Sequence, residues 1–261
     1  MTPDVVVDIG NTRVKWGWGE PLRMASLPPD DPAAWDDQLA RLPPAVRRSW
    51  AMAGVHPDRL SRLKGWAEAR GDAVRVITHD DIPIPIDVDE PARVGIDRLL
   101  NAVAASRLFE EMQQSPEGPF APDTPVVVID VGSAMTMDYL HSGSLFRGGA
   151  ILPGPWMMAR ALHEFTAKLP PIDPWTAEPA PAFGRNTTEA IQTGIQAAVL
   201  GAAVAFIRNL TVPGDKKPVV VVTGGGHGFL RGLWGAAGVE ALAEVPELTL
   251  DGIRLAAAAR E

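Results

Sequence analysis

Two short stretches of this chain combine residue types that could bind phosphate together with a cation. The first runs from Asp8 to Lys15 and the second from Asp130 to Thr136. Each follows an apolar β-branched run and reads as strand, tight turn, strand. The Gly of each turn allows close approach to a ligand, the following N–H groups and hydroxyls can bind phosphate oxygens, and the Asp can hold a cation associated with those phosphates. The first stretch contains, in order, Asp8, Ile9, Gly10, Asn11, Thr12, Arg13, Val14 and Lys15.

The repetition of this pattern matters more than either copy. One copy alone fits an ordinary hairpin turn equally well. Two copies in the two halves of one chain indicate a duplicated architecture. Two such loops facing each other would grip a nucleoside triphosphate from both sides, so the repeat favours phosphate binding.

Two further groups of residues could take part in chemistry. Gly95-Ile96-Asp97-Arg98 places an acid and a guanidinium at the start of a helix, where Asp97 could accept a proton from a hydroxyl and Arg98 could pair with a carboxylate or phosphate. The alternative is a helix-start Asp that complements the helix dipole, with the Arg in solvent. Thr223-Gly224-Gly225-Gly226 could pass beside a flat ring such as adenine, although a simple turn fits equally well.

Composition narrows the function classes. The chain has 261 residues, 46% of them hydrophobic and 21% charged, which is typical of a soluble globular protein. The net charge of −8 and the pI near 5.2 argue against a nucleic-acid surface. The absence of cysteine excludes disulfides and thiolate catalysis. Asp4 and Asp8 stand where a signal peptide would be basic, and the apolar run 197–207 is too short to span a bilayer, so we expect no membrane partner and a cytoplasmic location.

The elements that must position these residues follow from hydrophobic periodicity. The first half predicts strands over residues 5–9, 13–18, 23–27, 49–55 and 74–77, and helices over 32–42, 58–70 and 95–112. The second half predicts strands over 126–130, 134–140, 144–146 and 219–222, the last being the final core strand, and helices over 153–168 and 187–207. The segment 113–125, rich in Pro and polar residues, separates the halves. We therefore expect related sub-domains at residues 1–115 and 122–261, with Trp16 in a core or an interface.

In this order the motifs resemble those of the type III pantothenate kinases, a branch of the acetate and sugar kinase/Hsp70/actin superfamily. Asp8 to Lys15 is similar to the first phosphate loop of the family, and Asp130 to Thr136 to the second. Gly95 to Arg98 resembles its substrate and base motif. Further similar segments are Gly148 to Gly154, which looks like the start of the dimer-forming region, Gly184 to Thr187, and Thr223 to Gly225.

The resemblance implies an α/β fold with duplicated ribonuclease-H-like (actin-like) sub-domains around a central nucleotide cleft. It also implies ATP-dependent phosphorylation of pantothenate to 4′-phosphopantothenate by a homodimer. The first loop and Ser133 would bind ATP, Asp8 would help hold Mg²⁺ through the phosphates, and Asp130 would bind K⁺ or NH₄⁺. Asp97 would be the proton acceptor. The residues expected to contact pantothenate are Gly95, Ile96, Asp97, Arg98 and Thr187.

Two positions depart from the family pattern. Ser133 stands where Thr is usual, and Val88 stands where relatives often carry a Tyr that lines the pantothenate pocket. Two other functions stay open at this point: another small-molecule kinase of the superfamily, or a non-catalytic nucleotide-binding regulator. The joint presence of four residues argues against lost catalysis: Asp8, Lys15, Asp97 and Asp130.

Overall fold

The chain forms two compact units, each with its own sheet. The computed structural model describes residues 2–114, 120–121, 123–175, 181–210, 216–231 and 241–259. The first unit comprises Met1–Glu111, Ser144–Phe146 and Glu247–Glu261. The second comprises Met112–Gly143 and Arg147–Pro246. Among the described residues each unit contains a five-stranded sheet, and the strand orders of the two sheets resemble each other.

The sheet of the first unit combines a three-stranded meander with two parallel strands. Its order is β3 (Arg23–Leu27), β2 (Val14–Trp18), β1 (Val5–Ile9), β4 (Ser49–Gly54) and β5 (Ala73–Val76). β1 is antiparallel to β2 and parallel to β4, and β4 is parallel to β5. Alternate side chains of each strand therefore point to opposite faces, and both faces are covered by helices.

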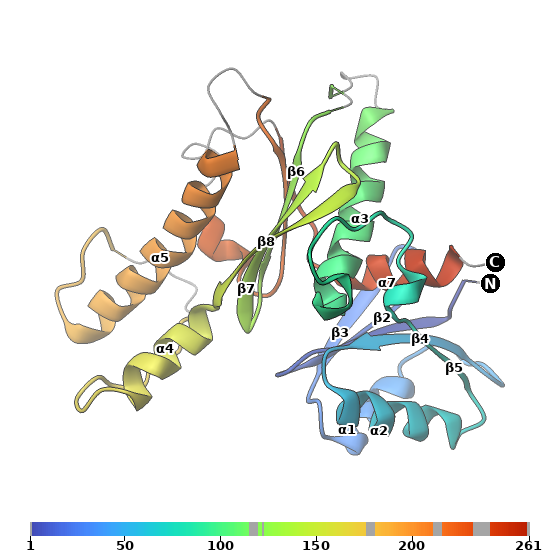
Figure 1. Ribbon diagram of the computed structural model, residues 1–261. Helices are drawn as coiled ribbons and strands as arrows, with labels where there is room; N and C mark the ends of the chain where they lie inside the picture. The colour runs from blue at the N-terminus through green and yellow to red at the C-terminus, as the bar shows by residue number, and fades with distance from the viewer. Residues whose placement is uncertain are drawn as a thin grey trace. The chain divides into compact units, whose positions relative to one another are not determined.

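One face of this sheet carries a tryptophan-rich core. Helices α1 (Pro32–Leu39) and α2 (Pro57–Glu68) pack against it, as Figure 1 shows. Trp16, Trp35 and Trp50 are buried there, with the partly buried Trp66 among them. The Trp16 and Trp50 ring centroids are 4.9 Å apart in an edge-on arrangement. Trp16 therefore lies in the core, one of the two placements expected for it.

The opposite face of the same sheet is covered by α3 (Ile96–Gln113) and α7 (Leu248–Ala258), which pack on Val6 and Ala51. The two helices approach each other closely, since a Cβ added at Gly252 would lie 2.1 Å from the carbonyl oxygen of Leu100. In the same buried region the Thr249 hydroxyl donates to Asn101 Oδ1 over 2.7 Å. These contacts fix the start of α3 relative to the sheet.

The sheet of the second unit repeats the topology of the first. Its order is β8 (Leu145–Pro153), β7 (Ala134–His141), β6 (Val126–Val131), β9 (Val219–Thr223) and β10 (Ala241–Glu244). β6 is antiparallel to β7 and parallel to β9, just as β1 is antiparallel to β2 and parallel to β4. A tight turn joins β7 to β8, with Ser142 and Gly143 both at positive φ.

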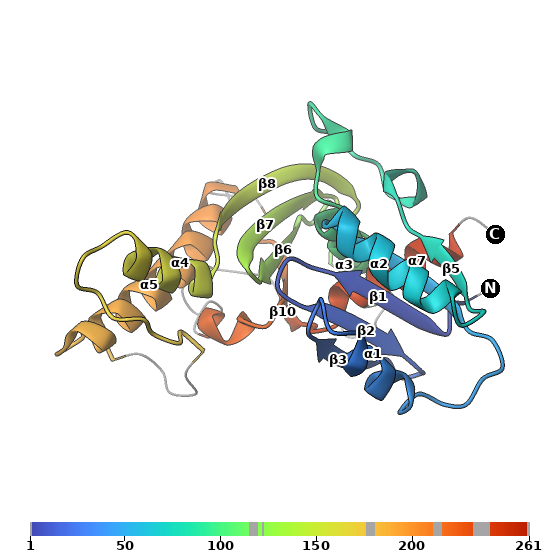
Figure 2. The same cartoon turned by 90° about the horizontal axis from the view of Figure 1, so that it is seen from below.

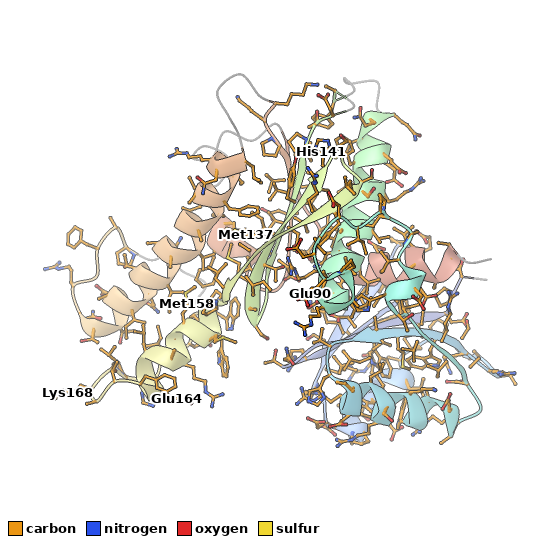
Figure 3. All side chains as sticks on the ribbon, in the orientation of Figure 1. Glu90, Met137, His141, Met158, Glu164 and Lys168 are labelled. Carbon is orange, nitrogen blue, oxygen red and sulfur yellow. The ribbon has the colours of Figure 1, made fainter. Side chains whose placement is uncertain are left out.

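One face of the second sheet is covered by α4 (Pro155–Glu164) and α5 (Thr187–Leu210), which lie side by side in Figure 2. The core beneath them includes Met137 from β7, with Met158 from α4 packed against it; both are labelled in Figure 3. Helix α5 has 24 residues and is apolar enough to cross a membrane by length and composition alone. The length argument made from residues 197–207 therefore does not extend to the whole helix. Its Ile191, Ile195 and Val199 nevertheless pack in the core of this unit.

Most expected elements are present, and two expectations were wrong. The strand expected at 144–146 is longer and continues to Pro153. At Gly149 it lies so close to β7 that an added Cβ would be 1.8 Å from the Met137 carbonyl oxygen. Residues 219–222 are not the last strand, since β10 pairs in parallel with β9 after them. β10 has no β-branched residue, so this pairing overrides its low strand propensity.

Candidate functional site

The turn between β1 and β2, which we call the first phosphate loop after the motif that it resembles, has a carboxylate and an ammonium group at its base. Asp8 lies opposite Lys15 in the antiparallel register, so the two side chains share one face of the sheet. The last paired residues are Ile9 and Val14, and between them the Gly10 N–H donates to the Arg13 carbonyl oxygen over 3.0 Å. Asp8 and Lys15 are half-buried, whereas residues 11–13 are exposed. The loop backbone is therefore open to a ligand while its base is fixed.

Long side chains hold this loop from two sides. The Arg13 guanidinium donates to Ser26 of β3, to Oγ over 3.0 Å and to the carbonyl oxygen over 2.7 Å. From α2, Arg59 donates to the carbonyl oxygen of Asn11. The Arg13 side chain thus ties the loop to the neighbouring strand, a role that the sequence pattern did not indicate.

At the start of α3, the base motif places a carboxylate in a half-buried position. Asp97 Oδ1 accepts from the Arg98 N–H over 2.9 Å. A Cβ added at Gly95 would lie 2.5 Å from that same oxygen, so only glycine leaves room for the Asp97 carboxylate in this arrangement. The motif spacing therefore has a local steric reason.

A second group of residues supports this motif from the segment preceding it. The His79 ring Nε2 lies 2.7 Å from the carbonyl oxygen of Val94, the residue before Gly95. His79 belongs to a short 3₁₀ helix closed by a capping box between Thr78 and Asp81. Burial raises the pKa of Asp81, but hydrogen bonds from Thr78 and the ion pair with Arg75 outweigh it and hold that pKa below its usual value.

Phe146 is a neighbour of the motif that the sequence did not reveal. The Arg98 guanidinium lies over the Phe146 ring at 5.7 Å from its centroid, within the range of a cation–π contact. Phe146 is fully buried, and its main chain pairs with residues 85–87. The Phe146 N–H donates to the Pro85 carbonyl oxygen, and the Phe146 carbonyl oxygen accepts from the Asp87 N–H. Val88 directly follows this pairing. Nothing in the spacing of Phe146 and Arg98 along the chain predicts their contact.

The second phosphate loop has the same place in its sheet but different neighbours. Asp130 lies opposite Thr136 on the antiparallel side and beside Thr223 on the parallel side. The Gly132 N–H closes the turn on the Ala134 carbonyl oxygen over 3.0 Å. The carbonyl oxygen of Ser133 accepts from the Gly154 N–H over 3.0 Å. Main-chain bonds thus hold this loop at its turn and at Ser133.

The glycine turn after β9 packs directly against the second loop. Gly224 has φ +86°, and a Cβ there would lie 2.4 Å from Asp130 Oδ1. The Gly226 N–H donates to the Val131 carbonyl oxygen over 2.9 Å. In the part of the chain that the structure describes, no three His, Asp or Glu side chains gather. The Asp130 carboxylate and the hydroxyls of its register neighbours Thr136 and Thr223 are oxygen ligands of the kind that hard cations prefer.

Thr187 begins helix α5 and is exposed. The residues before it form a helix start: Asn186 Oδ1 accepts from the Glu189 N–H over 2.9 Å, and Glu189 in turn accepts from the Arg185 N–H. A Cβ added at Gly184 would lie 2.1 Å from the Ala190 nitrogen. The motif from Gly184 to Thr187 is thus a capped helix start that presents Thr187 to solvent.

Two sheets of the same topology, each with an Asp near the end of the strand that precedes its first turn, define an actin-like fold. A solved structure of a putative 2-dehydro-3-deoxygalactonokinase from Sinorhizobium meliloti has the same fold, with a TM-score of 0.55, 14% sequence identity and 98% of each chain covered.

Within that class the chain belongs to the type III pantothenate kinase family, whose model matches residues 5–209. A type III pantothenate kinase of Gluconobacter oxydans is 32% identical over 270 residues, which cover 97% of this chain and 92% of the relative. One of Rhodopirellula baltica is 40% identical over 161 residues, 60% of this chain and 52% of the relative. The expected family, fold and enzyme class are confirmed.

Proposed function

We propose that this chain transfers the γ-phosphoryl group of ATP to the primary hydroxyl of pantothenate, giving 4′-phosphopantothenate for coenzyme A biosynthesis. The observation that carries the proposal is the family match over residues 5–209, which includes both phosphate loops and the base motif. In phosphoryl transfer the protein acts mainly by aligning the reactants and stabilising charge. The phosphate loops and the base motif supply groups suited to both of these tasks.

We assign acceptor activation to the start of α3. The pantothenate hydroxyl oxygen bonds to the γ-phosphorus, the bond to the β-phosphate oxygen breaks, and the hydroxyl proton passes to Asp97. The half-buried carboxylate of Asp97, with room left by Gly95, supports this role. Arg98 pairs with the pantothenate carboxylate while its guanidinium rests on Phe146. Ile96 and Thr187 complete the assigned pantothenate contacts.

We assign the ATP phosphates to both loops. The exposed main chain of residues 11–13 supports phosphate binding at the first loop, with Lys15 adding positive charge from the same sheet face as Asp8. In the second loop Ser133 supplies a hydroxyl, which keeps the donor of the usual Thr and loses only its methyl group. The glycine turn at 223–226 would pass beside the adenine ring.

We assign one cation to each of the two Asp side chains. Asp8 would help hold Mg²⁺ at the phosphates, and Asp130 would hold K⁺ or NH₄⁺. Such ions supply positive charge that stabilises the transferring phosphoryl group. The oxygen-rich surroundings of Asp130, formed where only Gly224 leaves space, support the monovalent assignment.

We also propose a cytoplasmic homodimer assembled through the second unit. Large apolar side chains are exposed along β8, α4 and the segment after α4: Ile151, Trp156, Met157 and Phe165. Exposed apolar groups on neighbouring elements are typical of a protein interface. The duplicated sheet orders support a division of the sequence into two repeated halves near the proposed limits 1–115 and 122–261, while residues 247–261 of the second half pack in the first compact unit.

ADP release with ATP, Mg²⁺ and K⁺ present tests the proposal. It should depend on pantothenate, and related alcohols such as pantetheine, glycerol and hexoses should give little. Equal release without pantothenate would contradict it, and release driven by another alcohol would indicate a different acceptor. Mixing ATP with the chain and observing binding without any turnover would favour the regulator alternative.

A further inference from the structure

Arg59 connects three parts of the first unit that are distant in the sequence. It lies in the first turn of α2, and its guanidinium donates to the Asn11 carbonyl oxygen in the middle of the first phosphate loop. The same guanidinium binds the Asp30 carboxylate in the segment before α1, through Nε over 3.1 Å and through a terminal nitrogen over 2.9 Å. Both partners are in the same compact unit as Arg59.

This arrangement differs from an ordinary surface ion pair. The Arg59 side chain is 20% exposed, whereas the neighbouring Arg62, which also pairs with Asp30 over 2.9 Å, is 54% exposed. The Nε–H and a terminal N–H of Arg59 both donate to Asp30 Oδ2, while Oδ1 accepts from Arg62, and two bonds to one oxygen restrict the orientation of the Arg59 guanidinium. A fixed guanidinium can then hold the Asn11 carbonyl in one direction.

The consequence for the loop follows from peptide geometry. The peptide unit between Asn11 and Thr12 is planar and trans, so its N–H points away from its carbonyl. Holding the Asn11 carbonyl toward α2 therefore directs the Thr12 N–H to the opposite side. The residues concerned are exposed, and a four-residue turn without such an anchor has several accessible conformations.

We propose that Arg59, fixed by Asp30, is a positioning residue for the nucleotide: it holds the first phosphate loop in its ATP-binding conformation through the Asn11 carbonyl. This inference rests on the proposed assignment of that loop to the ATP phosphates. Arg59 acts on the loop and not on the acceptor. Loss of the Arg59 guanidinium weakens nucleotide binding, because part of the binding free energy must then be used to order the loop.

The test compares Arg59→Met with Arg62→Met in the full-length chain. Met keeps much of the aliphatic length and removes the guanidinium. Arg62→Met is the matched control because it removes an equivalent charge from the same helix and the same Asp30, but no bond to the loop. The measurements are the dissociation constant of Mg·ADP by titration calorimetry, the KM values for ATP and pantothenate, kcat, and Tm.

Arg59→Met should raise the Mg·ADP dissociation constant and the KM for ATP about tenfold, which corresponds to about 1.4 kcal/mol. The KM for pantothenate should stay within about twofold, as should every constant of Arg62→Met. Nucleotide constants of Arg59→Met within twofold of the wild type overturn the inference. An equal loss in Arg62→Met also overturns it, since the effect then arises from helix α2 in general.

Asp30→Asn covers the case in which Arg59→Met does not fold. It leaves the Arg59 bond to Asn11 possible but removes the carboxylate that orients the guanidinium, so the Mg·ADP dissociation constant should rise about threefold. An unchanged constant contradicts the anchoring role. ADP binding needs no acceptor, so the Mg·ADP dissociation constants test the inference even when the wild type does not phosphorylate pantothenate. Failure to phosphorylate pantothenate counts against the proposed function alone.

Discussion

The two phosphate loops occupy the same place in two sheets of the same topology, yet they are held by different means. The first has four residues between the paired Ile9 and Val14, and arginine side chains tie it to β3 and α2. The second has three residues between the paired Val131 and the second residue of β7, Met135, and main-chain bonds and close glycine contacts hold it. The carboxylates also differ in surroundings: Asp8 lies opposite a lysine and Asp130 opposite a threonine.

We propose that the two turns, although they have the same place in their sheets, have different roles. A loop held by long side chains keeps an exposed main chain free to meet phosphates. A loop held by backbone contacts around a carboxylate forms a compact oxygen-rich site. We therefore expect the first loop to be sensitive to changes of charge and the second to be sensitive to an added methyl group.

The largest effect on kcat is expected at Asp97, the acid of the first unit that we assign to proton transfer. Asp97→Asn should lower kcat about 10²- to 10⁴-fold, the usual contribution of a general base, because Asn keeps the shape but accepts a proton very poorly. Nucleotide binding and Tm should change little. Asp58→Asn, another acid in the first turn of a helix, is the control. If Asp97→Asn keeps kcat within a few-fold, Asp97 is only a helix-start residue.

The next effect tests the second carboxylate. Replacing K⁺ and NH₄⁺ by Na⁺ or a bulky organic cation at constant ionic strength should reduce activity strongly, and Asp130→Ala should stay poorly active, by about 10²-fold, at any K⁺ concentration. The measurement is the initial rate against K⁺ concentration with Mg²⁺ held saturating. Full activity without either monovalent ion would remove the distinction drawn between Asp8 and Asp130.

A methyl group added to each loop region sharpens the comparison. Gly224→Ala places a Cβ 2.4 Å from Asp130 Oδ1 in a left-handed conformation, which costs about 1–2 kcal/mol, so we expect a lower Tm and about tenfold weaker K⁺ activation. Gly10→Ala meets only the Arg13 carbonyl oxygen at 3.2 Å and should be milder in both measurements. The reverse order of the two variants would contradict the comparison.

The smallest effect concerns the unfolding free energy, to which the buried Asp81 carboxylate contributes through its hydrogen bonds with Thr78 and its ion pair with Arg75. Because the folded pKa of Asp81 is lowered, its contribution is complete above the unfolded-state pKa of about 3.9 and is lost as the pH falls toward the lower folded value. Asp81→Asn should therefore reduce the unfolding free energy by about 1–2 kcal/mol at pH 7 and by less near pH 3. Denaturant titrations at the two pH values measure this, and an equal loss at both would contradict the assignment.

The sequence predicted the strands around both loops well, because β-branched runs followed by Asp and Gly are strong local signals. β1 and β3 match the expected bounds, and α3 differs by one residue at each end. The base motif was recognisable because Gly95, Asp97 and Arg98 are adjacent in the chain. Local chemistry of this kind can be read without a structure.

The features that were missed depend on contacts between distant segments. β10 was not predicted because it becomes a strand by pairing with β9. The contact of α7 with β1 joins the end of the chain to its start. Phe146 and Arg59 are ordinary residues in the sequence, and their importance comes only from the Arg98 and Asn11 atoms that they meet. No periodicity or spacing encodes such contacts.

Product analysis tests the central claim most directly. The chain is incubated with ATP, pantothenate, Mg²⁺ and K⁺, and ADP and 4′-phosphopantothenate are quantified together by mass spectrometry and ³¹P NMR. We expect a phosphomonoester of pantothenate in a one-to-one ratio with ADP, and loss of both products in Asp97→Asn. ADP accompanied by inorganic phosphate, with pantothenate unchanged, would contradict it.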